Sequence, residues 1–171
     1  MSTMISIRKA REEDAGALLQ LQRRLDRESQ FMLLEPDERT ATEDKLRERL
    51  KSYAASSNSV IMVAAVEGMH ELAGFVSVEG GGYRRNAHCG YIVTGVAASY
   101  AGQGVGTRLF EAVLAWSEQT PLTRLELTVM THNARAVALY KKMGFVVEGT
   151  KHRTLMVGGS PVDEYTMARL F

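Results

Sequence analysis

Three glycines at alternate positions, Gly102, Gly104 and Gly106, stand between a predicted strand and a predicted helix. The apolar residues of the strand end near Val96, and those after the glycines recur at helical spacing. The first-turn N–H groups of such a helix lack internal partners, and the helix dipole places partial positive charge there. Glycines let a ligand approach the backbone closely, so this pattern favours a phosphate or pyrophosphate site over a merely tight connection.

Two common phosphate-binding patterns do not fit this loop. The third glycine comes one residue too early for the G-x-G-x-x-G dinucleotide fingerprint, and no acidic residue follows at a suitable strand end. No Gly-Lys-Ser/Thr sequence occurs, which argues against a nucleoside-triphosphate loop. The identity of the phosphate ligand therefore stays open at this point.

Length, charge and cysteine content narrow the kind of protein. The chain has 171 residues and a formal net charge of +1, which fits one globular domain and gives no electrostatic case for nucleic acid or a membrane surface. The single cysteine, Cys89, excludes an internal disulfide, and the longest apolar run, Val60–Val66, is too short to span a bilayer. Met1–Asp14 contains no secretory signal. We expect a cytoplasmic protein without nucleic-acid or membrane partners.

Apolar periodicity and turn residues predict one mixed α/β domain (α+β-like), in which helices flank a central mixed sheet. The predicted order is β-α-α-β-β-β-α-β-α-β-β. Thr42 is a predicted helix cap, and Gly68 and the pair 158–159 are predicted hairpin turns. The expected elements are a strand at 4–8, helices from 12 and from 42, strands at 60–67, 71–79 and 87–96, a helix from 104, a strand at 124–130, a helix at 133–142, and strands at 145–157 and 162–170.

Two segments resemble a known family. The stretch GVAASYAGQGVGTRLFEAVLAW, residues 95–116, is similar to the acyl-CoA-binding segment of the GCN5-related N-acetyltransferase (GNAT) superfamily, which has a strand, a Q/R-x-x-G-x-G/A loop and a helix. NARAVALYKKMGF, residues 133–145, resembles the family's N-x-x-A-x-x-L-Y-x-x-x-G-F signature in order and spacing. The implied organisation is a single acetyltransferase-like domain over 1–171, with acceptor-side helices in 1–58, an acyl-CoA-binding core in 87–148 and a final strand pair in 145–171.

The resemblance implies an N-acetyltransferase that moves an acetyl group from acetyl-CoA to a primary amine of a small molecule or peptide, by direct attack in a ternary complex and without a metal. The first loop position, often Arg or Gln in the family, is Ala101 here, so Arg108 or Lys142 is a candidate for the missing charge. The residues that the resemblance assigns to the cofactor are Val96, Ala98, Ala101, Gly102, Gln103, Gly104, Val105, Gly106, Thr107, Asn133, Tyr140 and Lys142.

The resemblance also implies catalytic roles. Tyr140 occupies the family's general-acid position, and the N–H group of Val96 would stabilise the charge that develops on the thioester oxygen. Gly95 is expected at a bulge that splays its strand from the following one and opens a gap for the pantetheine arm. The base that deprotonates the amine is left open among Glu126, His88 and a chain of water molecules.

Acceptor specificity is expected from the segment Ser29–Arg39 and from the final hairpin. The candidate substrate-binding residues are Phe31, Met32, Glu35 and Glu79, and none of them selects one amine. Dimers are common among proteins of this family, which leaves a homodimer open. A non-catalytic CoA-binding or regulatory module, and a protein that binds another phosphate ligand, are the alternative functions.

Overall fold

The computed structural model describes residues 3–171, so the first two residues of the predicted domain lie outside the described part. Its elements follow the predicted order, with two short 3-10 turns added. They are β1 Ile5–Lys9, η1 Glu12–Asp14, α1 Ala15–Glu28, α2 Glu43–Ala54, β2 Val60–Val66, β3 Leu72–Gly80, β4 Cys89–Val96, η2 Ala98–Tyr100, α3 Val105–Ser117, β5 Arg124–Met130, α4 Ala134–Lys142, β6 Val146–Val157 and β7 Ser160–Leu170. The predicted fold class, a mixed α/β domain, is confirmed.

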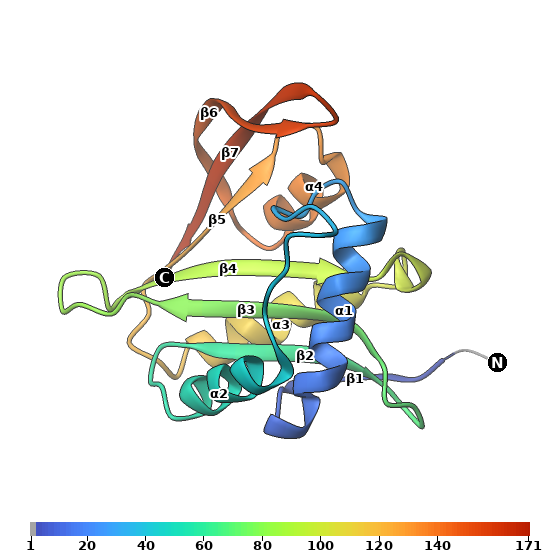
Figure 1. Cartoon of the computed structure of the whole chain (residues 1–171). Helices are drawn as coiled ribbons and strands as arrows, with labels where there is room; N and C mark the ends of the chain where they lie inside the picture. Colours follow the sequence, from blue (N-terminus) through green and yellow to red (C-terminus); the bar gives the residue numbers. More distant parts are fainter. Residues whose placement is uncertain (1–2) are drawn as a thin grey trace.

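All seven strands belong to one sheet, in the order β1-β2-β3-β4-β5-β7-β6. Neighbouring strands are antiparallel, except β4 and β5, which are parallel. Helices α1 and α2 cover one face of the sheet and α3 covers the other (Figure 1), each with its own apolar core. Within residues 3–171, no helix has both the length and the apolar character needed to cross a bilayer.

Local side-chain contacts explain where two helices begin. The Thr42 hydroxyl group accepts a hydrogen bond from the Lys45 N–H at 3.2 Å, as predicted for a helix cap. The Asn133 side chain does the same for the Ala136 N–H at 3.3 Å and so begins α4. Asn133 therefore has a structural role whether or not it also contacts a cofactor.

The two central strands separate after a short paired stretch. β4 pairs with β5 only from Cys89 to Tyr91, opposite Arg124 to Glu126. Beyond this point β4 remains paired with β3, and β5 remains paired with β7. The sheet is thus split between β4 and β5, while β4 keeps its pairing with β3 and β5 keeps its pairing with β7.

The predicted bulge at Gly95 is not present. The register between β3 and β4 runs without a shift through Gly95, and the split already begins after Tyr91. A Cβ atom at Gly95 would lie 2.7 Å from Leu25 Cδ1, so the glycine leaves room for the buried Leu25 side chain of α1 to pack closely against β4. The sequence prediction was right about a split and wrong about its cause.

Leu109 lies at the centre of the core between α3 and the sheet and is 0% exposed, whereas Leu170, near the end of β7, is 69% exposed. We expect Leu109→Ala to lower the free energy of unfolding by about 2–5 kcal/mol, because it removes buried methyl groups and leaves a cavity. The matched control Leu170→Ala should change it by about 0.5 kcal/mol or less. Urea unfolding of the two variants measures both, and equal losses would contradict this placement of the core.

Candidate active site

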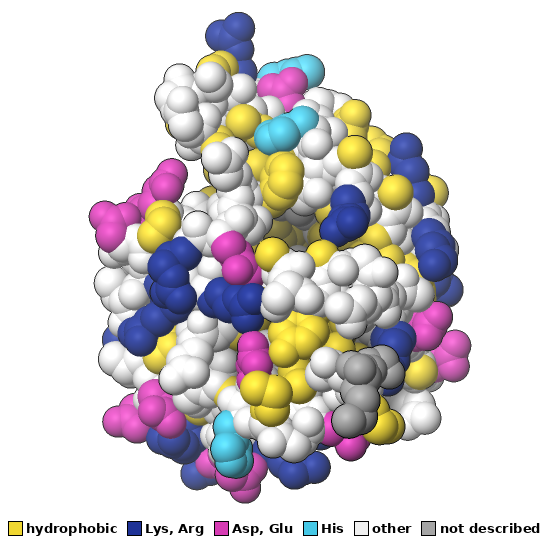
Figure 2. Space-filling model, turned by 90° about the vertical axis from the view of Figure 1, so that its right-hand side faces the viewer, with side chains coloured by type: hydrophobic (Ala, Val, Ile, Leu, Met, Phe, Trp, Pro, Cys, Tyr) yellow, Lys and Arg dark blue, Asp and Glu magenta, His cyan; other side chains and the backbone are white. Residues whose placement is uncertain are grey.

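A cavity of about 820 Å³ lies where β4 and β5 diverge. The two strands form its floor, the start of α3 and one side of α4 form one wall, and residues 29–34 form another. Figure 2 faces the side of the molecule on which the strands open, and shows hydrophobic side chains gathered in and around a hollow near the middle of that face. Much of the lining is apolar, and a few polar groups converge on the cavity, as in a ligand-binding site.

The glycine loop forms one end of this cavity. Gly104 is the residue before the first turn of α3 and has φ +77°, and Gly102 has φ +76°. These are left-handed conformations that other residues adopt only with strain. No side chain caps α3, so its first-turn N–H groups remain available to a ligand. The geometry is that of an anion site at a helix N-terminus.

Most residues predicted to bind the cofactor do line the cavity. They are Val96, Ala101, Gly102, Gly104, Val105, Gly106, Thr107, Asn133, Tyr140 and Lys142. Two of the predicted acceptor-side residues, Phe31 and Met32, line it as well. Because these residues line the same cavity, they are candidates for contacts with the cofactor or the acceptor, and their individual roles stay predictions.

A cation that the sequence analysis did not single out lies beside the glycine loop. Arg135 lines the cavity, and its Nη2 atom is 3.9 Å from the position that a Cβ atom at Gly102 would take. Arg108 is exposed and does not line the cavity, whereas Lys142, the other candidate for the charge missing at Ala101, does line it. Arg135 and Lys142, both on α4, are the cations on this side of the cavity.

The backbone of β4 presents its free groups to the split. The Ala97 N–H donates to the Ala73 carbonyl at 2.8 Å, and the Val93 carbonyl accepts from the Ser77 hydroxyl at 3.4 Å, so odd-numbered residues face β3. Backbone directions alternate along a strand, which turns the N–H group of Val96 towards β5 and the cavity. Val96 therefore has the orientation that an oxyanion-stabilising donor requires.

Tyr140 combines a packed ring with a free hydroxyl group. Its ring centroid lies 5.4 Å from that of Phe110 and 6.3 Å from that of Phe145, and the residue is only 8% exposed. The residue nevertheless lines the cavity, and its hydroxyl group makes no hydrogen bond within residues 3–171. Burial, helped by the nearby Tyr91, raises the pKa of Tyr140 to about 12. The phenol therefore stays protonated at neutral pH and can donate.

Both side chains predicted as possible bases lie outside the cavity. Glu126 forms an ion pair with Arg124 at 2.8 Å and stands at the last position where β5 is paired with β4. His88 is exposed and precedes β4 at the end remote from the glycine loop, where its carbonyl accepts from Thr123 and Arg124 N–H groups. The sequence assigns both residues to strands that flank the split, but it does not tell at which end of the split they lie.

Four further predicted residues do not line the cavity. The Ala98 N–H donates to Glu28 at 2.7 Å and is thereby engaged with α1. Gln103 is exposed, as is Glu35 on the acceptor-side segment. Glu79 lies beside Tyr91 in the paired part of the sheet and approaches Arg49 at 3.9 Å. These four residues thus lie outside the cavity, and their roles as ligand contacts stay predictions.

Besides Arg135, the cavity is lined by further polar residues that were not predicted as site residues. The Tyr91 and Thr128 hydroxyl groups hydrogen-bond at 2.8 Å across the point where β4 and β5 separate, and both residues line the cavity. Arg39 and Glu164 line it as well. No local motif marks these positions, because they converge only after strands and loops from distant parts of the chain assemble.

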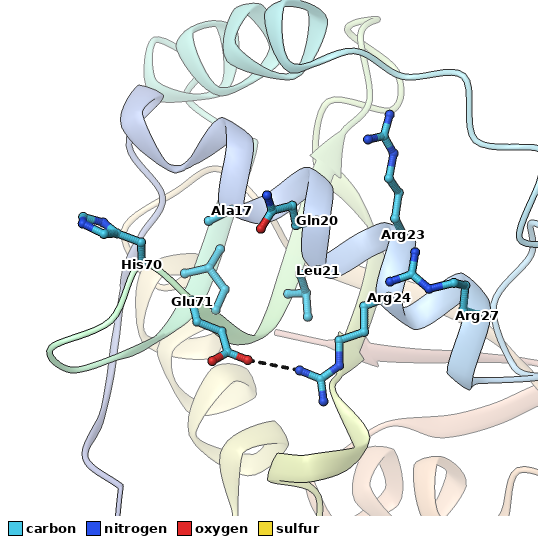
Figure 3. Close-up of a pocket in the computed structure, with 9 residues that line it drawn as sticks. Ala17, Gln20, Leu21, Arg23, Arg24, Arg27, His70 and Glu71 are labelled. Atoms are coloured by element: carbon cyan, nitrogen blue, oxygen red, sulfur yellow. Dashed lines mark hydrogen bonds and ion pairs between the residues drawn. The ribbon is translucent and has the colours of Figure 1, made fainter.

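A second, smaller hollow of about 430 Å³ lies between α1 and the turn before β3 (Figure 3). Arg24 points towards Glu71 and is paired with it at 3.1 Å. Arg24 also donates to the Ser99 hydroxyl at 2.7 Å, and so connects α1 to η2 just before the glycine loop. The glycine loop and Tyr140 do not reach this hollow, which leaves the larger cavity as the candidate active site.

Fold and cavity together define an enzyme class that holds an extended, phosphate-bearing cofactor between two diverging strands. Comparison with known families identifies which one. The model of the Acetyltransferase (GNAT) family matches residues 19–145, and the chain belongs to this family. The predicted family and the predicted class of enzyme, an acyl-CoA-dependent N-acetyltransferase, are both confirmed.

Individual relatives agree with this assignment. The chain is 30% identical over 110 residues to the L-amino acid N-acetyltransferase AaaT of Escherichia coli, covering 64% of this chain and 67% of that protein. A GNAT acetyltransferase from Streptococcus pneumoniae has a TM-score of 0.94 at 32% identity, with 98% of this chain and 100% of that chain covered. The acetyltransferase yncA of Salmonella typhimurium, solved with acetyl-CoA, has a TM-score of 0.82 at 18% identity, covering 97% and 93% of the chains, and shares the fold.

Because the pKa of Tyr140 is raised, the free energy of unfolding is expected to depend on this residue at high pH. In the unfolded chain a tyrosine ionises near pH 10, but folded Tyr140 keeps its proton until about pH 12. The stabilisation is fully present below pH 10, and about 2–3 kcal/mol of it should be lost as the pH rises to 12. Urea unfolding from pH 8 to 12 should show a shallower decline for Tyr140→Phe than for the unchanged protein. Parallel declines would contradict the burial of this hydroxyl group.

Proposed function

We propose that the cavity between β4 and β5 is the site where an acetyl group passes from acetyl-CoA directly to a primary amine. The observation that carries this proposal is the split itself, which lies between an anion-binding helix end and the Tyr140 hydroxyl group. A long cofactor that carries a pyrophosphate in its middle and a thioester at its end suits this arrangement, because the pyrophosphate can lie at the helix end and the thioester near Tyr140. The yncA structure, which was solved with its cofactor acetyl-CoA, supports the same ligand.

Cofactor binding would rely mainly on the backbone. The pyrophosphate would lie against the N–H groups of Gly104–Thr107, with Arg135 as a nearby counter-charge. The pantetheine amides would pair with the free inner edge of β4 up to Val96, as a neighbouring strand does. Because backbone groups supply these contacts, the absence of an Arg or Gln side chain at position 101 would weaken the electrostatic attraction of the pyrophosphate without removing the site.

The transfer itself needs a proton donor and an oxyanion donor. The amine nitrogen would form a bond to the thioester carbonyl carbon, and the bond from that carbon to sulfur would break. The Val96 N–H group would stabilise the charge on the oxygen, and Tyr140 would give its proton to the departing CoA thiolate. The ring contacts with Phe110 and Phe145 hold this phenol in one orientation.

The amine proton would leave by water on the acceptor side of the split. Tyr91 and Thr128 form a hydroxyl pair there, and these oxygens are suited to accept a hydrogen bond from the amine or from an intervening water molecule. Neither Glu126 nor His88 reaches the cavity, so neither is proposed as the base. A non-catalytic CoA-binding module would have no use for a free, oriented phenol, which favours the enzyme over this alternative.

Calorimetric titration with acetyl-CoA, with ATP and NAD as controls, tests the cofactor. We expect micromolar binding of acetyl-CoA alone. Gly104→Ala should weaken it about tenfold, because a left-handed φ of +77° strains any residue with a Cβ atom and displaces the loop. The matched control Gly82→Ala, where an added Cβ atom meets nothing within 4 Å, should bind as the unchanged protein does. An equal response to ATP or NAD would refute acetyl-CoA as the specific ligand.

Tyr140→Phe tests the general acid. The variant keeps the ring packing but loses the proton donor, so turnover should fall about 10- to 1,000-fold with any amine that a screen identifies. Acetyl-CoA affinity should stay nearly unchanged, because the pyrophosphate contacts lie elsewhere. Thiol release gives the rate, and calorimetry gives the affinity. A similar loss in both quantities would assign Tyr140 to binding instead.

A further inference from the structure

The acceptor side of the cavity is walled by large apolar side chains. Phe31 is 42% exposed and Leu33 is 76% exposed, and both line the cavity with Met32. The Phe31 ring lies 5.1 Å from the ring of His132, which places this segment beside the end of β5. Leu155 of β6 adds a further apolar surface. Apolar residues that remain exposed at the mouth of a cavity suit a ligand with an apolar body.

Arg39 lines the cavity at the end of the same segment as this wall, but its charge is already neutralised. Its Nε and Nη2 atoms donate to the two carboxylate oxygens of Asp26 at 2.6 and 3.0 Å. Asp26 is only 2% exposed, so it would be left as a buried, uncompensated charge if Arg39 turned to a ligand. Arg39 therefore holds residues 29–39 against α1 and does not serve as an anion receptor.

The other two cations that line the cavity belong to the cofactor side. Arg135 and Lys142 lie two helical turns apart on α4, with Leu139 on the same side of the helix. A Cβ atom at Gly106 would lie 3.0 Å from Leu139 Cδ2, and Arg135 lies beside Gly102. This side of α4 thus faces the glycine loop, where positive charge suits the phosphates of the cofactor.

Glu164 leaves a carboxylate on the acceptor side. It lies on β7 opposite Met130, the last residue of β5, and lines the cavity. One oxygen accepts a hydrogen bond from the Thr154 hydroxyl at 2.7 Å, and no ion pair to Glu164 occurs within residues 3–171. Lys151 stands opposite Glu164 on β6 but does not line the cavity. Among the residues that line the acceptor side, Glu164 is therefore the charged residue that is in no ion pair.

We propose that the acceptor is a primary amine on an apolar body that carries no carboxylate next to the amine, and that Glu164 attracts its ammonium form. A carboxylate at that position would meet Glu164 and would find no available cation, because Arg39 is bound to Asp26. Both a small amine and the N-terminus of a peptide have this chemistry, whereas a free amino acid does not. This inference rests on the proposed function and separates the chain from its Escherichia coli relative, named for L-amino acids.

Four compounds with the same phenylethyl group test the substrate class by thiol release from acetyl-CoA. They are L-phenylalanine, L-phenylalaninamide, 2-phenylethylamine and the tripeptide Phe-Gly-Gly. We expect kcat/KM for the amide to exceed that for L-phenylalanine about tenfold or more. A higher value for the tripeptide than for 2-phenylethylamine would assign a peptide N-terminus, and the reverse would assign a small amine. Equal rates for amide and free amino acid would overturn the inference.

Glu164→Gln tests the residue. The substitution can keep the contact with Thr154 and removes the charge, so kcat/KM for the amide should fall about tenfold while that for L-phenylalanine changes little. The affinity for acetyl-CoA should not change. Asp37→Asn, an exposed residue on the same acceptor-side segment as Phe31 but outside the cavity, should leave the ratio of the two substrates as it was. An equal loss for both substrates in Glu164→Gln would show a merely structural role and overturn the assignment.

The two levels of the proposal fail in different ways. If acetyl-CoA binds but none of the four compounds is acetylated, the proposed acceptor class is wrong and the cofactor site stands. If acetyl-CoA does not bind, the proposed function itself fails, and the assignment of Glu164 fails with it. Calorimetry on the unchanged protein separates these outcomes before any variant is made.

Discussion

The free inner edge of β4 is the constraint on which the rest of the site depends. β4 stays paired with β3 and β5 with β7, so the backbone groups beyond Tyr91 face each other across a gap. Backbone N–H and C=O groups need hydrogen-bond partners, from water or from a ligand. An extended ligand that carries amides can supply them as a strand would. The split thus offers backbone N–H and C=O groups to an extended ligand, and these contacts depend little on which side chains the strands carry.

The two faces of the sheet contribute different groups to the surroundings of this split. On one face, α3 and α4 pack over a common core and bring the glycine loop and Tyr140 to the gap. On the other, the buried Asp26–Arg39 pair holds residues 29–39 against α1. Phosphate-binding charge is therefore concentrated beside α4, and the acceptor side retains Glu164. Under the proposed function, the cofactor and the acceptor would therefore approach the split along surfaces of different charge.

Sequence reasoning found the elements because their signals are local. Helical spacing, the caps Thr42 and Asn133 and the glycine turns each act over a few residues, and the structure confirms the order of strands and helices. It failed where side chains from distant segments converge. The hydroxyl pair of Tyr91 and Thr128 joins two strands that are far apart in sequence, and no spacing rule connects them. The sequence assigned Glu126 and His88 to the two strands beside the split, but it did not show that both lie at the paired end of these strands, outside the cavity.

What the sequence by itself determined is the anion-binding loop, the signature around Tyr140 and the family to which they belong. These depend on backbone conformation and on helical periodicity, which neighbouring residues dictate. Only the tertiary structure decided where the sheet splits and which charges remain free beside the split. Hydrogen-bond pairing across strands and the neutralisation of Arg39 by Asp26 are properties of assembled surfaces. The chemistry of the cofactor could therefore be predicted from the sequence, whereas the proposal for the acceptor depends on how the chain packs.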